Sequence, residues 1–241
     1  MNRCLFIVLI LLICTPAIGQ DSTWHMHFAG SGNVNKTNTG TSYIFNNALR
    51  TTYARKVVNV NSALSWIYGE NTGRKTNNDF LAVFDFDLFK KNHQWYYWGL
   101  GGYEKSYSLK ITDRIQAGGG IGYNLLDKKN AVIILTDGLL YEKSVLSEED
   151  IYDRLRYETI RNSFRLKYRF VIKEIITIEG VHFLQNSLND RQDYIIRSSS
   201  SIGFRLMKWL SIQTGLMYNK MNLTNKSNLL FTYGINIDQY F

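Results

Sequence analysis

Charged side chains recur at every second position in several segments of the chain, and this spacing places residues on one face of a β-strand. In one such segment, Arg165, Lys167 and Arg169 alternate with the apolar residues Leu166 and Tyr168. A charged face of this kind could fill the interior of a β-barrel with paired charges, or it could line a pore whose basic wall favours anions. The charges that we assign to this interior are Asp85, Asp87, Asp113, Arg161, Arg165, Lys167, Arg169, Glu179, Arg197 and Arg205.

A serine beside a histidine could perform acyl transfer, because the imidazole takes the hydroxyl proton while the oxygen attacks an ester. His182 is the candidate base, and the candidate nucleophiles are Ser187 and Ser199 to Ser201. Nothing in their spacing fixes a contact, and such sites are recognised by geometry. We therefore predict no catalysis and no cofactor, and we keep a lipid hydrolase or acyltransferase as an alternative.

Two further patterns suggest ligand chemistry that the rest of the sequence does not support. His25 and His27 share one face of a strand and could begin a metal site, but no third ligand is identifiable, so we predict no metal. The glycine-rich run from Gly118 to Gly122 alternates within a strand and opens no helix, as a phosphate-binding loop must. We attribute these glycines to packing in the lumen or to a sharply bent wall.

The first 19 residues have the organisation of a secretory signal peptide. Arg3 precedes an apolar run over residues 5–13, and the small-residue ending Ala17-Ile18-Gly19 suggests cleavage after Gly19. Lipid attachment at Cys14 is the alternative, although such signals place a small residue where Ile13 stands. No later segment contains an apolar run of about 20 residues, the length that a membrane-spanning helix needs. We expect one domain over residues 20–241.

The composition of that domain suits paired strands. The single proline and both cysteines fall within the signal peptide, and aromatic residues make up 14% of the chain. Proline is kept out of central strands because it cannot donate to the ladder, whereas aromatic residues favour strands and form girdles in outer-membrane barrels. The net charge of +8 falls to +7 without Arg3. Because an exported protein does not normally meet nucleic acid, we expect no such partner.

Alternation and regular polar breaks predict twelve antiparallel strands, each long enough to cross a membrane. A count of ten is the alternative. The chain then forms an all-β, up-and-down transmembrane barrel with both ends on one side and its longest outer loop from Val145 to Asp153. The predicted strands are 23–34, 41–54, 57–69, 76–89, 94–107, 112–126, 131–144, 154–170, 174–187, 191–206, 210–221 and 228–241.

Period-two alternation does not tell which face of the strands meets water, so a soluble periplasmic binding protein with the faces reversed is a second alternative. We prefer the membrane barrel because charges crowd one face and apolar residues recur on the other. Its expected location is the outer membrane, among lipid and lipopolysaccharide. Phe241, an aromatic last residue, is typical of barrels delivered to the barrel assembly machinery. The expected role is a narrow channel for an unidentified small solute, or an envelope-integrity protein.

Several short motifs occur in a characteristic order between Trp24 and Glu142. They are Gly32-Asn33, Tyr103-Glu104-Lys105, Asp113-Arg114, Gly118-Gly119-Gly120-Ile121-Gly122-Tyr123, Gly138 and Tyr141-Glu142. This order resembles the salt-induced outer-membrane protein family, which is domain of unknown function family 481. The resemblance covers most of the expected domain and implies an outer-membrane barrel of unassigned activity, with no catalytic residue to carry over.

Overall fold

The computed structural model describes residues 23–37, 40–55, 57–89 and 94–240 and contains twelve β-strands. Their bounds are β1 Trp24–Thr37, β2 Gly40–Ala54, β3 Val58–Asn71, β4 Arg74–Phe89, β5 Trp95–Ser106, β6 Ile111–Lys128, β7 Ala131–Leu146, β8 Arg156–Ile172, β9 Ile176–Ser187, β10 Tyr194–Arg205, β11 Leu210–Met221 and β12 Lys226–Tyr240. The predicted count of twelve is therefore confirmed, and the alternative of ten is wrong. The predicted signal peptide and Phe241 lie outside the described residues.

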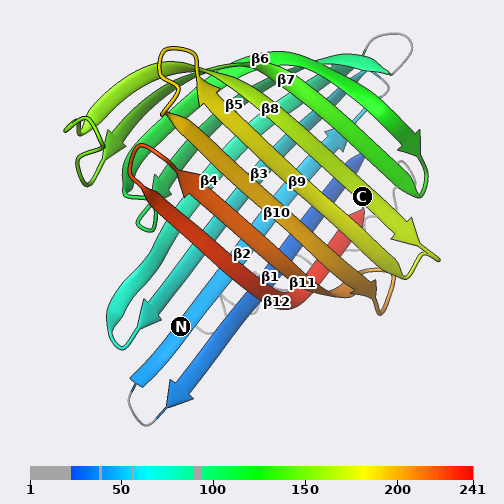
Figure 1. Ribbon diagram of the computed structural model, residues 1–241. Helices are drawn as coiled ribbons and strands as arrows, with labels where there is room; N and C mark the ends of the chain where they lie inside the picture. Colours follow the sequence, from blue (N-terminus) through cyan, green and yellow to red (C-terminus); the bar gives the residue numbers. More distant parts are fainter. Residues whose placement is uncertain (1–22, 38–39, 56, 90–93, 241) are drawn as a thin grey trace, which may run out of the picture.

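Each strand pairs antiparallel with its neighbours in sequence, and β1 pairs with β12, which closes the barrel (Figure 1). The closing seam runs from His25–Tyr240 to Ser31–Gly234. In contrast, β1 pairs with β2 over its whole length, as far as Thr37–Gly40. Within the described residues, the loop-side half of β1 therefore pairs with β2 alone.

The two ends of the barrel differ in their connections. The terminal end is where β1 begins and β12 finishes. The loop end carries residues 107–110, 147–155, 188–193 and 222–225 between the strands. Residues 147–155 overlap the predicted longest loop and form the longest connection among the described residues. No helix in the described part of the chain is long and apolar enough to cross a membrane.

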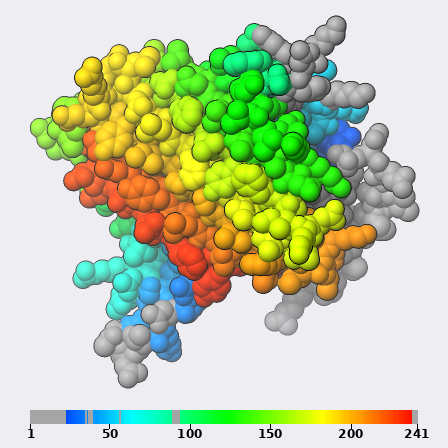
Figure 2. All heavy atoms as spheres, turned by 45° about the vertical axis from the view of Figure 1, so that its right-hand side comes forward, coloured from blue at the N-terminus to red at the C-terminus, as the bar shows by residue number. Residues whose placement is uncertain are grey.

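Alternation along the strands separates an apolar outer face from a polar lumen. On β8, Phe164 points outward and is 42% exposed, whereas Arg161 and Ser163 point inward and are buried. Figure 2 shows one side of the barrel, where β6 to β12, coloured green to red, form a continuous wall. Because the apolar side chains point away from the lumen, the reversed arrangement of a soluble binding barrel does not describe this fold.

Aromatic pairs lie on the outer surface near both ends. At the terminal end, the ring centroids of Trp24 and Tyr53 are 4.8 Å apart. Toward the loop end, Trp66 and Tyr68 lie 5.8 Å apart. Two aromatic bands that bound an apolar surface are typical of outer-membrane barrels, whose aromatic side chains sit at the membrane interfaces.

The glycine-rich run bends the wall where β6 and β7 curve strongly (Figure 1). A Cβ atom at Gly120 would collide with the carbonyl oxygen of Asp137 on β7, and one at Gly118 would collide with that of Leu139. The indole of Trp98 packs into this bend and donates a 3.2 Å hydrogen bond to the Ile121 carbonyl. Glycine is therefore required for close backbone approach.

Candidate functional site

The middle and terminal end of the lumen contain charges from β4 and β8. Asp85 accepts a 2.8 Å hydrogen bond from the Asn61 amide. The neighbouring inward residue, Asp87, has a buried carboxylate oxygen without a hydrogen-bond partner among the described residues. Arg165 donates to the Thr136 hydroxyl at 3.1 Å. Alternation in the sequence therefore predicted which of these charged side chains point into the lumen.

The remaining predicted charges of the terminal half are more exposed. Arg169 and Glu179 are 3.8 Å apart, and about half of each side chain is exposed. Lys167 and Arg205 are exposed as well. Because Arg169, Glu179 and Arg205 keep much of their surface exposed, this half of the lumen can admit water and ions.

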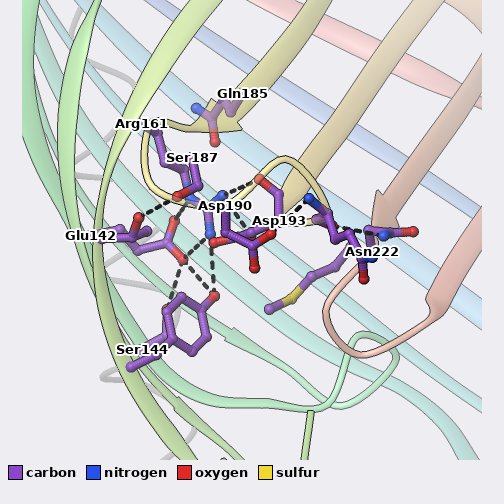
Figure 3. Close-up of polar contacts among 12 residues, drawn as sticks. Glu142, Ser144, Arg161, Gln185, Ser187, Asp190, Asp193 and Asn222 are labelled. Atoms are coloured by element: carbon purple, nitrogen blue, oxygen red, sulfur yellow. Dashed lines mark hydrogen bonds and ion pairs between the residues drawn. The ribbon is translucent and has the colours of Figure 1, made fainter. Parts of the chain in front are cut away.

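A fully buried ion pair lies toward the loop end. Arg161 donates two hydrogen bonds to Glu142, at 2.8 and 3.0 Å, and both side chains are 0% exposed. Its third nitrogen lies 2.7 Å from Asp193 Oδ1, which comes from the 188–193 connection. Figure 3 shows Glu142, Arg161 and Asp193 pointing toward one another. The pair is bidentate, an arrangement that fixes both groups in orientation.

A second buried arginine extends these contacts across the lumen. Arg114 on β6 donates to Glu104 on β5 at 3.1 Å and lies 3.3 Å from Glu142. Arg197, on the opposite wall, also donates to Glu104, and Arg114 contacts the Met221 sulfur at 2.8 Å. We call this set the loop-end ion network: Glu104, Arg114, Glu142, Ser144, Tyr157, Arg161, Asp193 and Arg197.

Apolar side chains close the space beyond the network. The cluster comprises Leu109, Ile111, Leu146, Tyr157, Ile195, Met221 and Leu223. It brings together five strands and two loop-end connections. Because Leu223 and Met221 are 0% exposed, water does not reach the lumen through this part of the loop end.

A cavity of about 160 Å³ lies beside the network. Arg197 and Glu104 line it together with the hydroxyl of Ser199 and apolar groups such as Phe183. The Nε atom of Arg197 is buried and has no hydrogen-bond partner among the described residues. The cavity therefore combines an apolar wall with a cation that has an unused donor, a combination that suits a small anion.

Asp113 lies outside the lumen, contrary to the sequence assignment. Its carboxylate accepts a 2.6 Å hydrogen bond from the Tyr103 hydroxyl and lies 3.6 Å from the Lys105 ammonium group, on the outer surface. The neighbouring Arg114 takes the inward position. A charge can face outward here because the position is near the loop end, where it meets polar partners beyond the apolar band.

The histidine–serine combinations also differ from those expected. Ser187 contacts Thr159 in the lumen, and Ser199 and Ser201 face the lumen, whereas His182 points outward. The partner of His182 is Ser198, which lies directly opposite on β10. Among the described residues, no group of three or more His, Cys, Asp or Glu is placed to hold a metal ion. His25 and His27 have ring centroids 6.4 Å apart.

Sequence reasoning missed Glu104, Arg114, Glu142 and Asp193 as parts of one site. Three of them stood in the motifs that carried the family resemblance: Tyr103-Glu104-Lys105, Asp113-Arg114 and Tyr141-Glu142. Their side chains now converge in one network. Charged residues in such motifs were thus a signal, but only the folded barrel shows that they meet.

The closed barrel, its apolar outer face and its charged lumen define the outer-membrane class of β-barrel proteins. The chain belongs to the family described as "Protein of unknown function, DUF481", whose model matches residues 30–232. This confirms the resemblance to domain of unknown function family 481.

Two solved structures share the fold. The NanC porin superposes with a TM-score of 0.56 at 10% identity, over 89% of this chain and 99% of that chain. The translocator domain of autotransporter NalP from Neisseria meningitidis gives 0.50 at 8% identity, over 89% of this chain and 86% of that chain. No curated protein matches the chain in sequence. At these identities the likeness concerns the fold alone.

Proposed function

We propose that the protein is a narrow, anion-preferring channel of the outer membrane, exported by the signal peptide at residues 1–19. The observation that carries the proposal is the contrast along the lumen. Exposed charges occupy the terminal half, whereas the loop-end ion network fills the other half, with Arg161 and Glu142 fully buried at its centre. A lumen of this kind passes small solutes only when the network rearranges.

The orientation follows from the connections. Bacterial barrels place short turns and both termini on the periplasmic side and longer loops outside. The terminal end then faces the periplasm, and the network closes the outer mouth. Lipid and lipopolysaccharide surround the apolar band, and Phe241 serves as the contact for the barrel assembly machinery.

Anion preference follows from the basic side chains of β8 in the water-accessible part of the lumen. Replacing both Arg165 and Arg169 with serine should lower the anion-to-cation permeability ratio in planar bilayer recordings. A matched control replaces Lys105, which lies on the outer surface, with serine. Unchanged selectivity of the double variant would refute the proposed role of these arginines.

The membrane location has its own test. A closed barrel purified from outer membranes should migrate faster before boiling than after boiling on a denaturing gel. Recovery in the soluble periplasmic fraction without this mobility shift would instead support a soluble binding protein.

A further inference from the structure

The outer surface of β8, β9 and β10 carries a polar cluster with apolar neighbours. Outward neighbours such as Phe164, Leu184 and Ile202 are each more than 40% exposed. The cluster itself consists of Tyr168, His182, Ser198 and Ser200. Polar and ionisable groups are expensive on a lipid-facing surface, and their presence there points to a function.

The geometry within the cluster is that of an acyl-transfer pair. Ser198 Oγ lies 2.7 Å from His182 Nδ1, in a cross-strand pair of β10 and β9. The imidazole stacks on the Tyr168 ring, with centroids 5.6 Å apart and an interplanar angle of 24°. The Tyr168 hydroxyl in turn lies 3.1 Å from Ser200 Oγ. The ring of the base is therefore held in place, and its nitrogen already contacts the serine hydroxyl.

We propose that Ser198 and His182 form a lipid-facing catalytic site that hydrolyses acyl esters of membrane lipids, with Ser198 as the nucleophile and His182 as the general base. This activity goes beyond channel function, although it rests on the proposed location of the barrel in a membrane. Both side chains are only partly buried, so a substrate can reach them from the lipid side. Both side chains lie on the outer surface of the barrel, which acyl lipids surround, so the substrate class we propose is acyl lipid.

The chemistry balances with these groups alone and one water molecule. Ser198 Oγ attacks the ester carbonyl carbon and passes its proton to His182 Nδ1, while the imidazole keeps its other proton on Nε2. The carbon–oxygen bond to the lipid alcohol breaks, and the leaving oxygen takes the proton from Nδ1. Water then attacks the acyl-serine with His182 as base, releasing the fatty acid and returning the proton to Ser198.

The hydroxyls of Ser200 and Tyr168 extend the same outward face. Serine and tyrosine hydroxyls are among the donors that stabilise the oxyanion in acyl transfer. We assign this role to Ser200, which lies two residues from Ser198 on the same face of β10. The backbone amides of these strands are paired within the sheet and do not supply the donor.

The depth of the pair suits an ester group. Tyr194 accepts a 2.9 Å hydrogen bond from Lys220, which marks the polar edge of the outer surface near the loop end. Ser198 lies four residues further along β10, which at about 3.3 Å per residue and a tilt of about 40° is roughly 10 Å deeper. The headgroup layer is about 6 Å thick on each side. Ser198 therefore lies within a few ångströms of the boundary where acyl esters are found.

The test uses the full mature protein in detergent micelles with two probes. An alkyl fluorophosphonate should form an adduct that peptide mass spectrometry places on Ser198. A diacyl phospholipid in mixed micelles should release fatty acid. S198A should abolish the adduct, and H182Q should slow fatty-acid release by about 10²-fold to 10⁴-fold. The matched control is S201A, which removes a hydroxyl on the lumen side of the same strand.

Each variant is first checked for the mobility shift of the folded barrel, so that loss of folding is distinguished from loss of chemistry. A folded protein that shows neither adduct nor fatty-acid release overturns the catalytic proposal and leaves the channel proposal intact. Equal rates of fatty-acid release for the parent protein and the folded S198A or H182Q variant also overturn it.

Discussion

Replacing Glu142 with glutamine removes the charge on which two buried arginines converge. The carboxylate accepts hydrogen bonds from Arg161 at 2.8 and 3.0 Å and from the Tyr157 hydroxyl at 2.6 Å, and it lies 3.3 Å from Arg114. Glutamine keeps the shape but leaves Arg161 with Asp193, and Arg114 with Glu104, as their remaining carboxylate partners, so two buried arginines share one carboxylate fewer. Arg114 and Arg161 are 1% and 0% exposed, so water does not replace the lost carboxylate. Breaking a buried ion pair of this kind costs about 3–5 kcal/mol.

The loss should be measured as a decrease in the free energy of unfolding, obtained from urea titrations of the barrel in lipid vesicles. The matched control is E158Q on the outer surface. Glu158 pairs with Lys143 at 2.8 Å, but the two side chains are 51% and 61% exposed, and such pairs contribute about 0–1 kcal/mol. The E142Q variant should also conduct more in bilayers, because the outer mouth loosens. If the free energy of unfolding of E142Q lies within about 1 kcal/mol of that of the parent protein, the stabilising role of the buried ion pairs is refuted.

Two further predictions concern the wall and the loop end. G120A should prevent folding, seen as loss of the gel mobility shift, because its Cβ meets a backbone oxygen of β7, whereas G101A, where nothing lies within 4 Å, should fold normally; a normally folding G120A would contradict the close approach. The hydrogen bond from Lys110, at 2.7 Å, lowers the pKa of Glu148. Because the pKa of Glu148 is lower in the folded protein than the value of about 4.3 in the unfolded chain, its charge stabilises the folded loop at pH values above about 4.3. This stabilisation is lost as the pH falls through the pKa that Glu148 has in the folded protein. Amide hydrogen exchange in residues 147–155 should therefore accelerate below about pH 4 relative to the intrinsic exchange rate. The E148Q variant should show fast exchange at neutral pH as well. Identical pH profiles for the parent protein and E148Q would contradict the role of Glu148 in holding this loop.

Much of the architecture could be predicted because a barrel wall has a simple period. The expected strand at 210–221 matches β11, and the alternation on β8 correctly divided its two faces. The bend at Gly118 to Gly122 was one of the two explanations that the sequence offered for these glycines, since glycine in a strand indicates close backbone approach.

The site was harder to predict because it depends on contacts between distant parts of the chain. Arg197 reaches Glu104 across 93 sequence positions, and no local pattern encodes such a contact. Ser198 meets His182 through the register of β9 and β10, and a shift of one residue would have placed Ser199 there instead. Asp113 was misplaced because its charge was given more weight than its position, since strict alternation from the outward Ile115 puts Asp113 outward and Arg114 inward.

The closing seam between β1 and β12 has a consequence for how the chain folds. The seam joins residues at opposite ends of the sequence. Because pairing between residues far apart in the sequence is slow, we expect the seam to form after the hairpins between these ends. Among the described residues the seam is also incomplete, because pairing stops at Ser31–Gly234 while β1 continues to Thr37. Strand edges left unpaired are templates for another strand. We therefore expect this seam to form last, to open first on heating, and to be the place where a folding factor holds the chain before release.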